Sequence, residues 1–245
     1  MFTDELLTYL FDGQAHILTE PMGAWLGSSR RFTAFVDTCR DKIRKKIRVT
    51  QEEETLLDLR LELETAYLLL QEKSLALAYE PQLAERVRSP DFAVSYTTSL
   101  TFMLEVTRLR SSSNSVVEGN SPNNIGDRLA DAVCSKLGQL VHQQSNILLV
   151  GVDALHLTQE DIRAAMLRLQ QRAERNDPAF FERYRFRDRT DFFRHYQRLS
   201  EILIRGTGLG QQGEFLAWVN PQAKVPLPGK VRTVLYRSQV IDMSP

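Results

Sequence analysis

The sequence predicts a mixed α/β fold in which a helix, three antiparallel strands, a second helix and a further strand follow one another. Hydrophobic residues recur at helical spacing on both sides of three short segments that read as strands. The composition, with 42% hydrophobic and 25% charged residues over 245 positions, is that of an ordinary folded chain. It excludes disorder, collagen and a coiled coil as descriptions of the whole chain.

The first 49 residues are expected to form a helical N-terminal extension. Its clearest helix covers Arg30 to Arg48, where apolar residues recur every three or four positions. Eight basic residues in this segment outnumber two acids, Asp37 and Asp41. The basic side is either an ordinary solvated helix face or a surface that contacts phosphates, and both readings stay open.

A second helix is expected from Thr50 to Gln71. Thr50 is a good N-cap, and Glu53 follows three residues later as in a capping box. Leucines surround Glu62 and Glu64 in the most apolar part of the segment. Each carboxylate lies either at the edge of the apolar face or in the interior for a purpose, and the leucine pattern does not separate the two.

Strands follow this helix. The second and third are separated by only four residues, which predicts an antiparallel hairpin. The three expected strands are Ser74 to Glu80, Asp91 to Tyr96 and Thr101 to Thr107. Residues 111–124 are rich in turn formers and predict a mobile loop, followed by a helix from Ile125 to His142. The apolar run from Asn146 to Asp153 predicts a strand buried on both faces.

The remaining chain is expected to contain a long helical stretch followed by two strands. A long helical stretch runs from Thr158 to Arg205 with an interruption near Asp177-Pro178, and strands are expected at Glu214 to Val219 and at Val231 to Tyr236. We therefore expect a single domain over residues 1–245. Its parts are a helical extension (1–49), an α/β core (50–153), a helical insertion (154–206) and a C-terminal strand region (207–245).

Charge and cysteine content exclude few function classes. The 31 basic and 31 acidic residues balance, so net charge does not indicate a nucleic-acid or membrane partner. Asp4 and Glu5 stand where a signal peptide would carry lysines, and no apolar run is long enough to span a membrane. Together with the sparse cysteines, Cys39 and Cys134, this predicts a cytoplasmic protein with no membrane partner.

Two short motifs carry the expected chemistry. Asp91 follows Ser89-Pro90 at the start of one hairpin strand, and Glu105 and Thr107 lie on the next strand, on the face opposite their apolar neighbours. If the strands pair, the two carboxylates approach one another, and a cation between them relieves their repulsion. Magnesium suits such oxygen ligands because it keeps several waters that a phosphate can replace.

The order of elements, with Pro90-Asp91 on the second strand and Glu105-Val106-Thr107 on the third, resembles the PD-(D/E)XK nuclease-like superfamily. The resemblance covers about residues 50–153 and implies a restriction-endonuclease-like core. It also implies hydrolysis of phosphodiesters in DNA with Mg²⁺ or Mn²⁺. Asp91 and Glu105 would then be metal ligands, and Glu62 or, as the weaker choice, Glu64 would complete the acidic cluster.

The sequence departs from the family at Thr107, where the family has a lysine. A threonine hydroxyl cannot supply the positive charge that offsets charge in the transition state. Lys136, on the helix after the predicted loop, is the expected substitute, with Gln139 one turn further on the same face.

Two function classes follow. The chain is either a magnesium-dependent endonuclease, or an inactive protein of the same fold that binds nucleic acid or another protein. DNA is the expected partner, and association into a homodimer stays open.

Two other patterns receive ordinary structural interpretations. Residues 208–213 match a dinucleotide-binding pattern by letters but follow a helix and precede a strand, so we expect a loop. The aromatic residues between Phe180 and Tyr196 are expected to pack in a core rather than to stack on bases.

Overall fold

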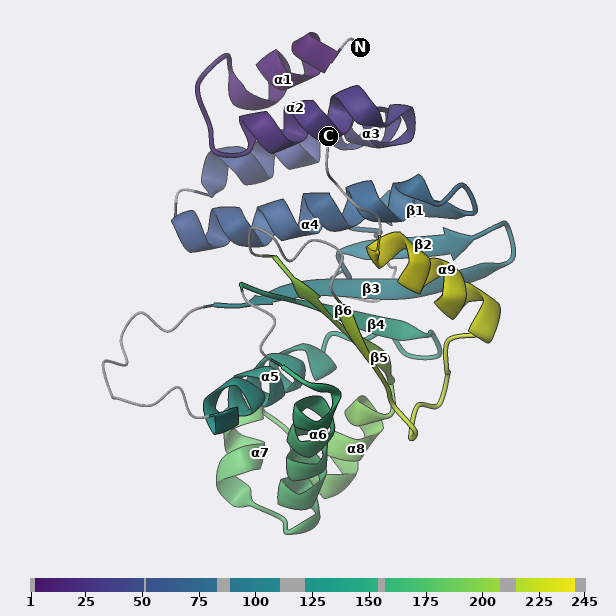
Figure 1. Ribbon diagram of the computed structural model, residues 1–245. Helices are drawn as coiled ribbons and strands as arrows, with labels where there is room; N and C mark the ends of the chain where they lie inside the picture. The colour runs from purple at the N-terminus through teal and green to yellow at the C-terminus, as the bar shows by residue number, and fades with distance from the viewer. Residues whose placement is uncertain are drawn as a thin grey trace.

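A computed structural model describes residues 3–50, 52–82, 89–110, 122–153, 157–207 and 215–240. These residues form one mixed sheet between two layers of helices (Figure 1). The strands are β1 (Leu75–Tyr79), β2 (Phe92–Tyr96), β3 (Leu100–Leu109), β4 (Asn146–Val152), β5 (Leu199–Gly206) and β6 (Phe215–Val219). The helices are α1 (Thr3–Phe11), α2 (Thr19–Ser28), α3 (Arg30–Val49), α4 (Glu53–Gln71), α5 (Pro122–Leu137), α6 (Gln159–Glu174), α7 (Pro178–Tyr184), α8 (Arg189–Tyr196) and α9 (Gly229–Gln239).

The strands lie in the sheet in chain order, from β1 to β6. The first three form an antiparallel meander, as predicted, in which Phe92 pairs with Tyr79 on one side and with Leu104 on the other. Strands β3, β4 and β5 are parallel, and β6 returns antiparallel to β5. Every residue of β4 is buried, which confirms the predicted strand covered on both faces.

Each face of the sheet has its own hydrophobic core. Helices α1 to α4 and α9 cover one face, and α5 to α8 cover the other (Figure 1). Leu104 and Val106 of β3 belong to the first core, whereas Leu148 and Val150 of β4 belong to the second. The alternation of side chains along each strand therefore decides which helical layer a residue meets.

Helices α3 and α4 confirm the two predicted N-terminal helices, but their junction differs. Thr50 is the C-cap of α3, where its backbone N–H donates to Lys46 O, and α4 begins at Glu53. The prediction of Thr50 as an N-cap was wrong because its N–H completes the last turn of the preceding helix. The residue before α4, Glu52, makes no side-chain cap.

Two predictions for the C-terminal half were wrong. The predicted helical stretch ends at Tyr196, and residues 199–206 form β5 instead. The sequence does not indicate this buried strand because it contains two charged residues, Glu201 and Arg205. Both are buried, and they form ion pairs with Arg232 and Glu64 respectively. The break at Asp177-Pro178 is confirmed, since Asp177 caps α7.

Residues 231–236 are helical, as part of α9, and do not form the predicted strand. Val231 and Leu235 are four residues apart and both buried, which is the spacing of a helix face. The predicted strand at the start of this region is confirmed as β6.

Some predictions fall on residues outside the structural description. Most of the predicted mobile loop, at 111–121, and the glycine-containing segment 208–213 are among them. Both cysteines are free thiols. The helices within the described ranges include none that is long and apolar enough to cross a membrane.

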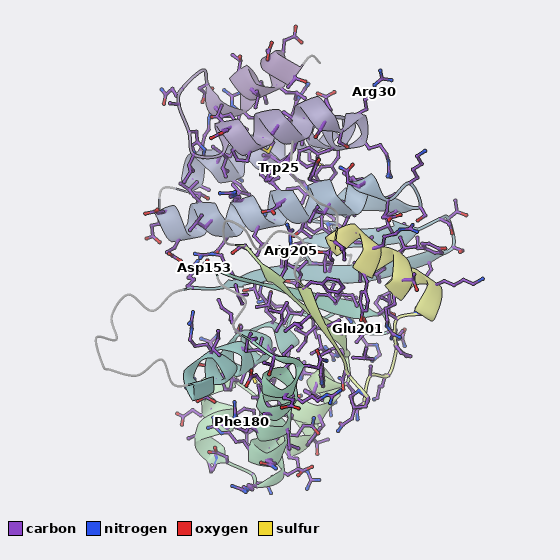
Figure 2. All side chains as sticks on the ribbon, in the orientation of Figure 1. Trp25, Arg30, Asp153, Phe180, Glu201 and Arg205 are labelled. Atoms are coloured by element: carbon purple, nitrogen blue, oxygen red, sulfur yellow. The ribbon has the colours of Figure 1, made fainter. Side chains whose placement is uncertain are left out.

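The aromatic segment packs as expected. Phe180, Phe192 and Tyr196 are fully buried; the ring of Phe192 meets Phe180 edge to face and stacks on Tyr196. Figure 2 shows Phe180 inside the layer of α5 to α8. These rings hold the helical layer together and are not available to stack on bases.

Candidate functional site

A cleft of about 310 Å³ opens where α3, α4 and α5 meet β3 and the residue that precedes β2. Its lining contains three of the predicted site residues. The lining residues are Lys46, Thr50, Thr55, Asp58, Leu59, Glu62, Asp91, Val106, Thr107 and Lys136. The fold therefore brings together side chains from five segments of the sequence, which span residues 46 to 136.

Asp91 lies directly before β2, as expected. Its Oδ2 accepts the backbone N–H of Val106 at 2.7 Å, which joins the carboxylate to β3. The register of the paired strands ends with Phe92 opposite Leu104, and Asp91 lies one residue beyond this pair. The hairpin thus places Asp91 at the entry to β2, which begins one residue after the predicted start at Asp91, and Glu105 on the neighbouring strand β3.

Glu105 and Lys136 form a largely buried ion pair. Lys136 Nζ, in the last turn of α5, donates to Glu105 Oε2 at 3.1 Å. The Glu105 side chain is 4% exposed and that of Lys136 is 22% exposed. Since Leu104 and Val106 pack into the opposite core, β3 turns Glu105 toward α5. A lysine on α5 therefore reaches the strand that carries Glu105.

Glu62 faces the cleft, and Glu64 does not. Lys46 Nζ, from α3, donates to Oε1 and Oε2 of Glu62 at 2.8 and 3.0 Å. Glu64 instead pairs with Arg205 inside the protein, between α4 and β5. Figure 2 shows Arg205 in the interior, in contrast to Arg30, which projects into solvent. The two glutamates that the sequence left undecided thus serve different contacts.

Burial and mutual repulsion shape the electrostatics of the cleft. Burial, reinforced by the charge of Asp91, raises the pKa of Glu62 to about 7. Burial also raises the pKa of Asp91, against the opposing effects of the Val106 N–H and of Lys136. Burial disfavours the charged form of Lys46, but Glu62 and its other neighbours hold the pKa of that ammonium group above its usual value. Two crowded carboxyl groups are thus balanced by two lysines.

Gln139 does not share the helix face of Lys136. Helix α5 ends at Leu137, and Gln139 lies in the following turn, where its N–H donates to Lys136 O. The predicted helix to His142 was too long, because this turn ends the regular hydrogen bonding. Gln139 is not one of the residues that line the cleft.

Thr107 and Arg108 of β3 have different surroundings. Thr107 lines the cleft at the position where a lysine was expected from the resemblance. Arg108 points to the other side of β3, where it pairs with Glu54, Asp58 and Asp153.

The oxygen donors of the cleft suit a magnesium ion that keeps several waters, and they do not suit a metal held entirely by protein ligands. Among the residues that the structure describes, no three His, Cys, Asp or Glu side chains are arranged to hold a metal ion. Lysines engage two of the three expected ligands, Glu62 and Glu105. Magnesium is usually bound through one or two carboxylates and keeps waters in its other positions. Asp91 and Glu62 line the cleft and are oxygen donors of this kind, whereas Glu105, which Lys136 engages, is not one of the lining residues.

Lys46 is the residue that sequence reasoning missed. The sequence places it among the basic residues of α3, three residues after Ile43 and one before Ile47, both of which are buried. That position borders the apolar stripe, so it could have indicated a lysine directed toward the next helix.

Most of the basic side of α3 is used inside the protein. Arg44 and Arg48 pair with Asp12, and Arg31 donates to backbone carbonyls near β1. Lys42 donates to the carbonyls of residues 79 and 80. The charge surplus of this helix therefore mainly holds the N-terminal helices against each other and against the sheet edge.

Comparison of the chain with protein-family models, curated proteins and solved structures gives no match. The residues of the cleft and their geometry therefore carry the functional argument.

Proposed function

We propose that the chain is a divalent-metal-dependent nuclease that hydrolyses phosphodiester bonds of DNA in this cleft. The observation that carries the proposal is that Lys136, which donates to Glu105 at 3.1 Å, lines the cleft together with Asp91. The order of α4, the β1 to β3 meander, α5 and β4 supports a restriction-endonuclease-like core. Lys136 brings to the cleft the positive charge that Thr107 lacks.

Asp91 and Glu105 would hold Mg²⁺ or Mn²⁺, with Glu62 beside them. Such a metal, when bound, lowers the pKa of its water and stabilises negative charge on phosphate oxygens. Lys136 donates one N–H to Glu105, and its ammonium group has two further N–H donors for the attacking water or a phosphate oxygen. Thr107 offers a neutral hydroxyl to the same space. Gln139 has no part in this arrangement.

Phosphate contacts outside the cleft are better supplied by α6 to α8 than by α3. The arginines of α3 are largely paired. Many arginines of the α6 to α8 region are exposed, although Arg183 pairs with Asp131, and Arg187 and Arg194 pair with Asp191. The exposed ones are Arg163, Arg175, Arg183, Arg185, Arg187, Arg189 and Arg194. Guanidinium groups on one helical layer are suited to a phosphate backbone. DNA, rather than RNA, is taken from the family resemblance alone.

A second function has a specific observation in its favour. Lys46 and Lys136 neutralise Glu62 and Glu105 without any metal, and Thr107 stands in place of a lysine. A cleft balanced in this way suits an inactive protein of the same fold that binds nucleic acid or a protein partner.

Cleavage of end-labelled single-stranded, duplex and branched DNA with Mg²⁺, Mn²⁺ or EDTA separates these functions. We expect metal-dependent cutting that falls about 100-fold or more in Asp91→Asn and in Glu105→Gln. Glu53→Gln, at an exposed carboxylate of the first turn of α4, is the matched control and should cut like the wild type. DNA binding by folded wild type without cutting in either metal would favour the binding protein.

A further inference from the structure

Lys46 reaches the cleft from α3 and contacts two carboxylates at once. Its Nζ lies 2.8 Å from Oε1 of Glu62 and 2.8 Å from Oε1 of Glu80. The ammonium group also lies 4.8 Å from the centre of the Tyr79 ring, as in a cation–π contact. These contacts place a positive charge at the Glu62 end of the cleft.

The two carboxylate partners of Lys46 are not equivalent. Glu62 lines the cleft and its side chain is 9% exposed, whereas Glu80 is not a lining residue and its side chain is 34% exposed. A lysine that lost Glu62 would keep Glu80 and the Tyr79 ring. Its charge would therefore not be left unpaired in a buried place, which is the usual large cost of breaking such a pair.

Glu80 is held in position by its backbone. Its φ of +42° lies in the left-handed region, which a residue with a Cβ adopts only when its surroundings impose it. The Glu80 N–H donates to Asp91 O at 2.9 Å, and its carbonyl accepts from Lys42 Nζ at 3.1 Å. Glu80, the second carboxylate partner of Lys46, is thus held by a backbone hydrogen bond to Asp91, which lines the cleft.

We propose that Lys46 competes with the divalent metal for Glu62, and that Glu80 retains Lys46 when the metal takes Glu62. This inference rests on the proposed function, because it concerns the metal of that same cleft. The described residues contain no cluster of three potential metal ligands. Lys46 holds Glu62 and Lys136 holds Glu105, which is consistent with carboxylates that move toward the metal only when it binds. The affinity of the cleft for the metal then depends on how strongly Lys46 binds Glu62.

Binding of Mn²⁺ without DNA, followed by electron paramagnetic resonance of the free ion at one fixed pH, tests this competition. Removal of the competitor in Lys46→Gln should tighten Mn²⁺ binding about tenfold. Glu80→Gln should weaken binding about threefold or more, because Lys46 then has Glu62 as its remaining carboxylate partner. The gain from Lys46→Gln should disappear when Glu62→Gln is added.

Lys45→Gln is the matched control, since it removes the same charge from an exposed neighbour on α3. Circular dichroism and thermal melting show whether each variant is folded, and the half-exposed Glu80 keeps the test usable if Lys46→Gln does not fold. Affinity in Lys46→Gln no tighter than in Lys45→Gln, or tighter binding in Glu80→Gln, would overturn the competition and leave the proposed nuclease standing. No Mn²⁺ binding by the wild type or by Lys46→Gln would overturn both.

Discussion

Lys136 Nζ lies 3.1 Å from Glu105 Oε2 and joins the last turn of α5 to the middle of β3. The pair is shielded from water, so its members depend on one another for charge compensation more than a surface pair would. It also fixes the end of α5 over the strand that carries the candidate ligands. The contact therefore has consequences for stability as well as for chemistry.

Lys136→Met should destabilise the fold, because it leaves the Glu105 carboxylate buried without this partner. We expect the free energy of unfolding to fall by about 3 kcal/mol, and part of it to return when Glu105→Gln is added. Urea denaturation of the single and double variants measures the effect. Lys230→Met removes an exposed lysine of α9 and should change stability by less than about 0.5 kcal/mol. Equal stabilities of the two lysine variants would contradict the role of the pair.

Glu62 should make stability depend on pH between its unfolded and folded pKa values. Burial and the nearby Asp91 raise its pKa from 4.5 to about 7, so the folded state holds this proton more tightly than the unfolded state. The resulting stabilisation is complete below pH 4.5 and is lost as the pH rises toward 7.

Urea unfolding of the wild type and Glu62→Gln, without divalent metal, tests that dependence. The wild type should lose on the order of 3 kcal/mol relative to the variant as the pH rises from about 4.5 to about 7. A difference between the two proteins that stays constant over this range would show that Glu62 titrates as an ordinary carboxyl group.

Gly151 is needed for the close approach of α4 to β4. A Cβ at this position would lie 2.5 Å from Leu61 Cδ2 and 3.0 Å from Thr207 Cγ2. Gly151→Ala should therefore lower the free energy of unfolding by about 1 to 3 kcal/mol, as overpacking does. Gly27→Ala, in α2 with open space around the added methyl group, should be neutral or stabilising by up to about 1 kcal/mol. Thermal or urea unfolding distinguishes the two.

Exposed arginines in the layer of α5 to α8 should contact DNA phosphates and so determine the salt dependence of DNA binding. Replacement of Arg187, Arg189 and Arg194 by Gln should reduce the slope of log affinity against log salt by about 2 to 3, if each contacts one phosphate. The control removes three charges from α3, at Arg40, Arg44 and Arg48, which are paired with Asp37 and Asp12. A larger change of slope in the α3 variant would place the DNA on the other layer.

The sequence was most informative where periodicity and local chemistry agreed. The β1 to β3 meander, α3, α4 and the buried β4 followed from alternation, helical spacing and turn residues. The predicted hairpin put Asp91 and Glu105 on adjacent segments of the chain, and Asp91 indeed joins β3 through its bond to the Val106 N–H. Periodicity failed at β5, where Glu201 and Arg205 interrupt an apolar strand, since their buried partners lie far away in the sequence.

Long-range contacts explain what the sequence left open in the cleft. Glu62 and Glu64 are two residues apart on α4, and only their partners, Lys46 and Arg205, show which one faces the cleft. Lys136 was a candidate because α5 was expected to pack on the sheet, and its contact with Glu105 follows from that packing. Lys46 was not predicted as a site residue because its position beside an apolar stripe does not indicate which residue it pairs with.

In the proposed nuclease, Lys136 supplies the positive charge that is missing at Thr107. Single-turnover cleavage of duplex DNA in Mg²⁺ by the wild type, Lys136→Met and the double variant Lys136→Met with Thr107→Lys tests it most directly. We expect Lys136→Met to slow cutting by about 100-fold or more, and the lysine placed on β3 to restore at least about tenfold of the loss. Cutting by Lys136→Met at the wild-type rate, or no metal-dependent cutting by the wild type, would contradict the account.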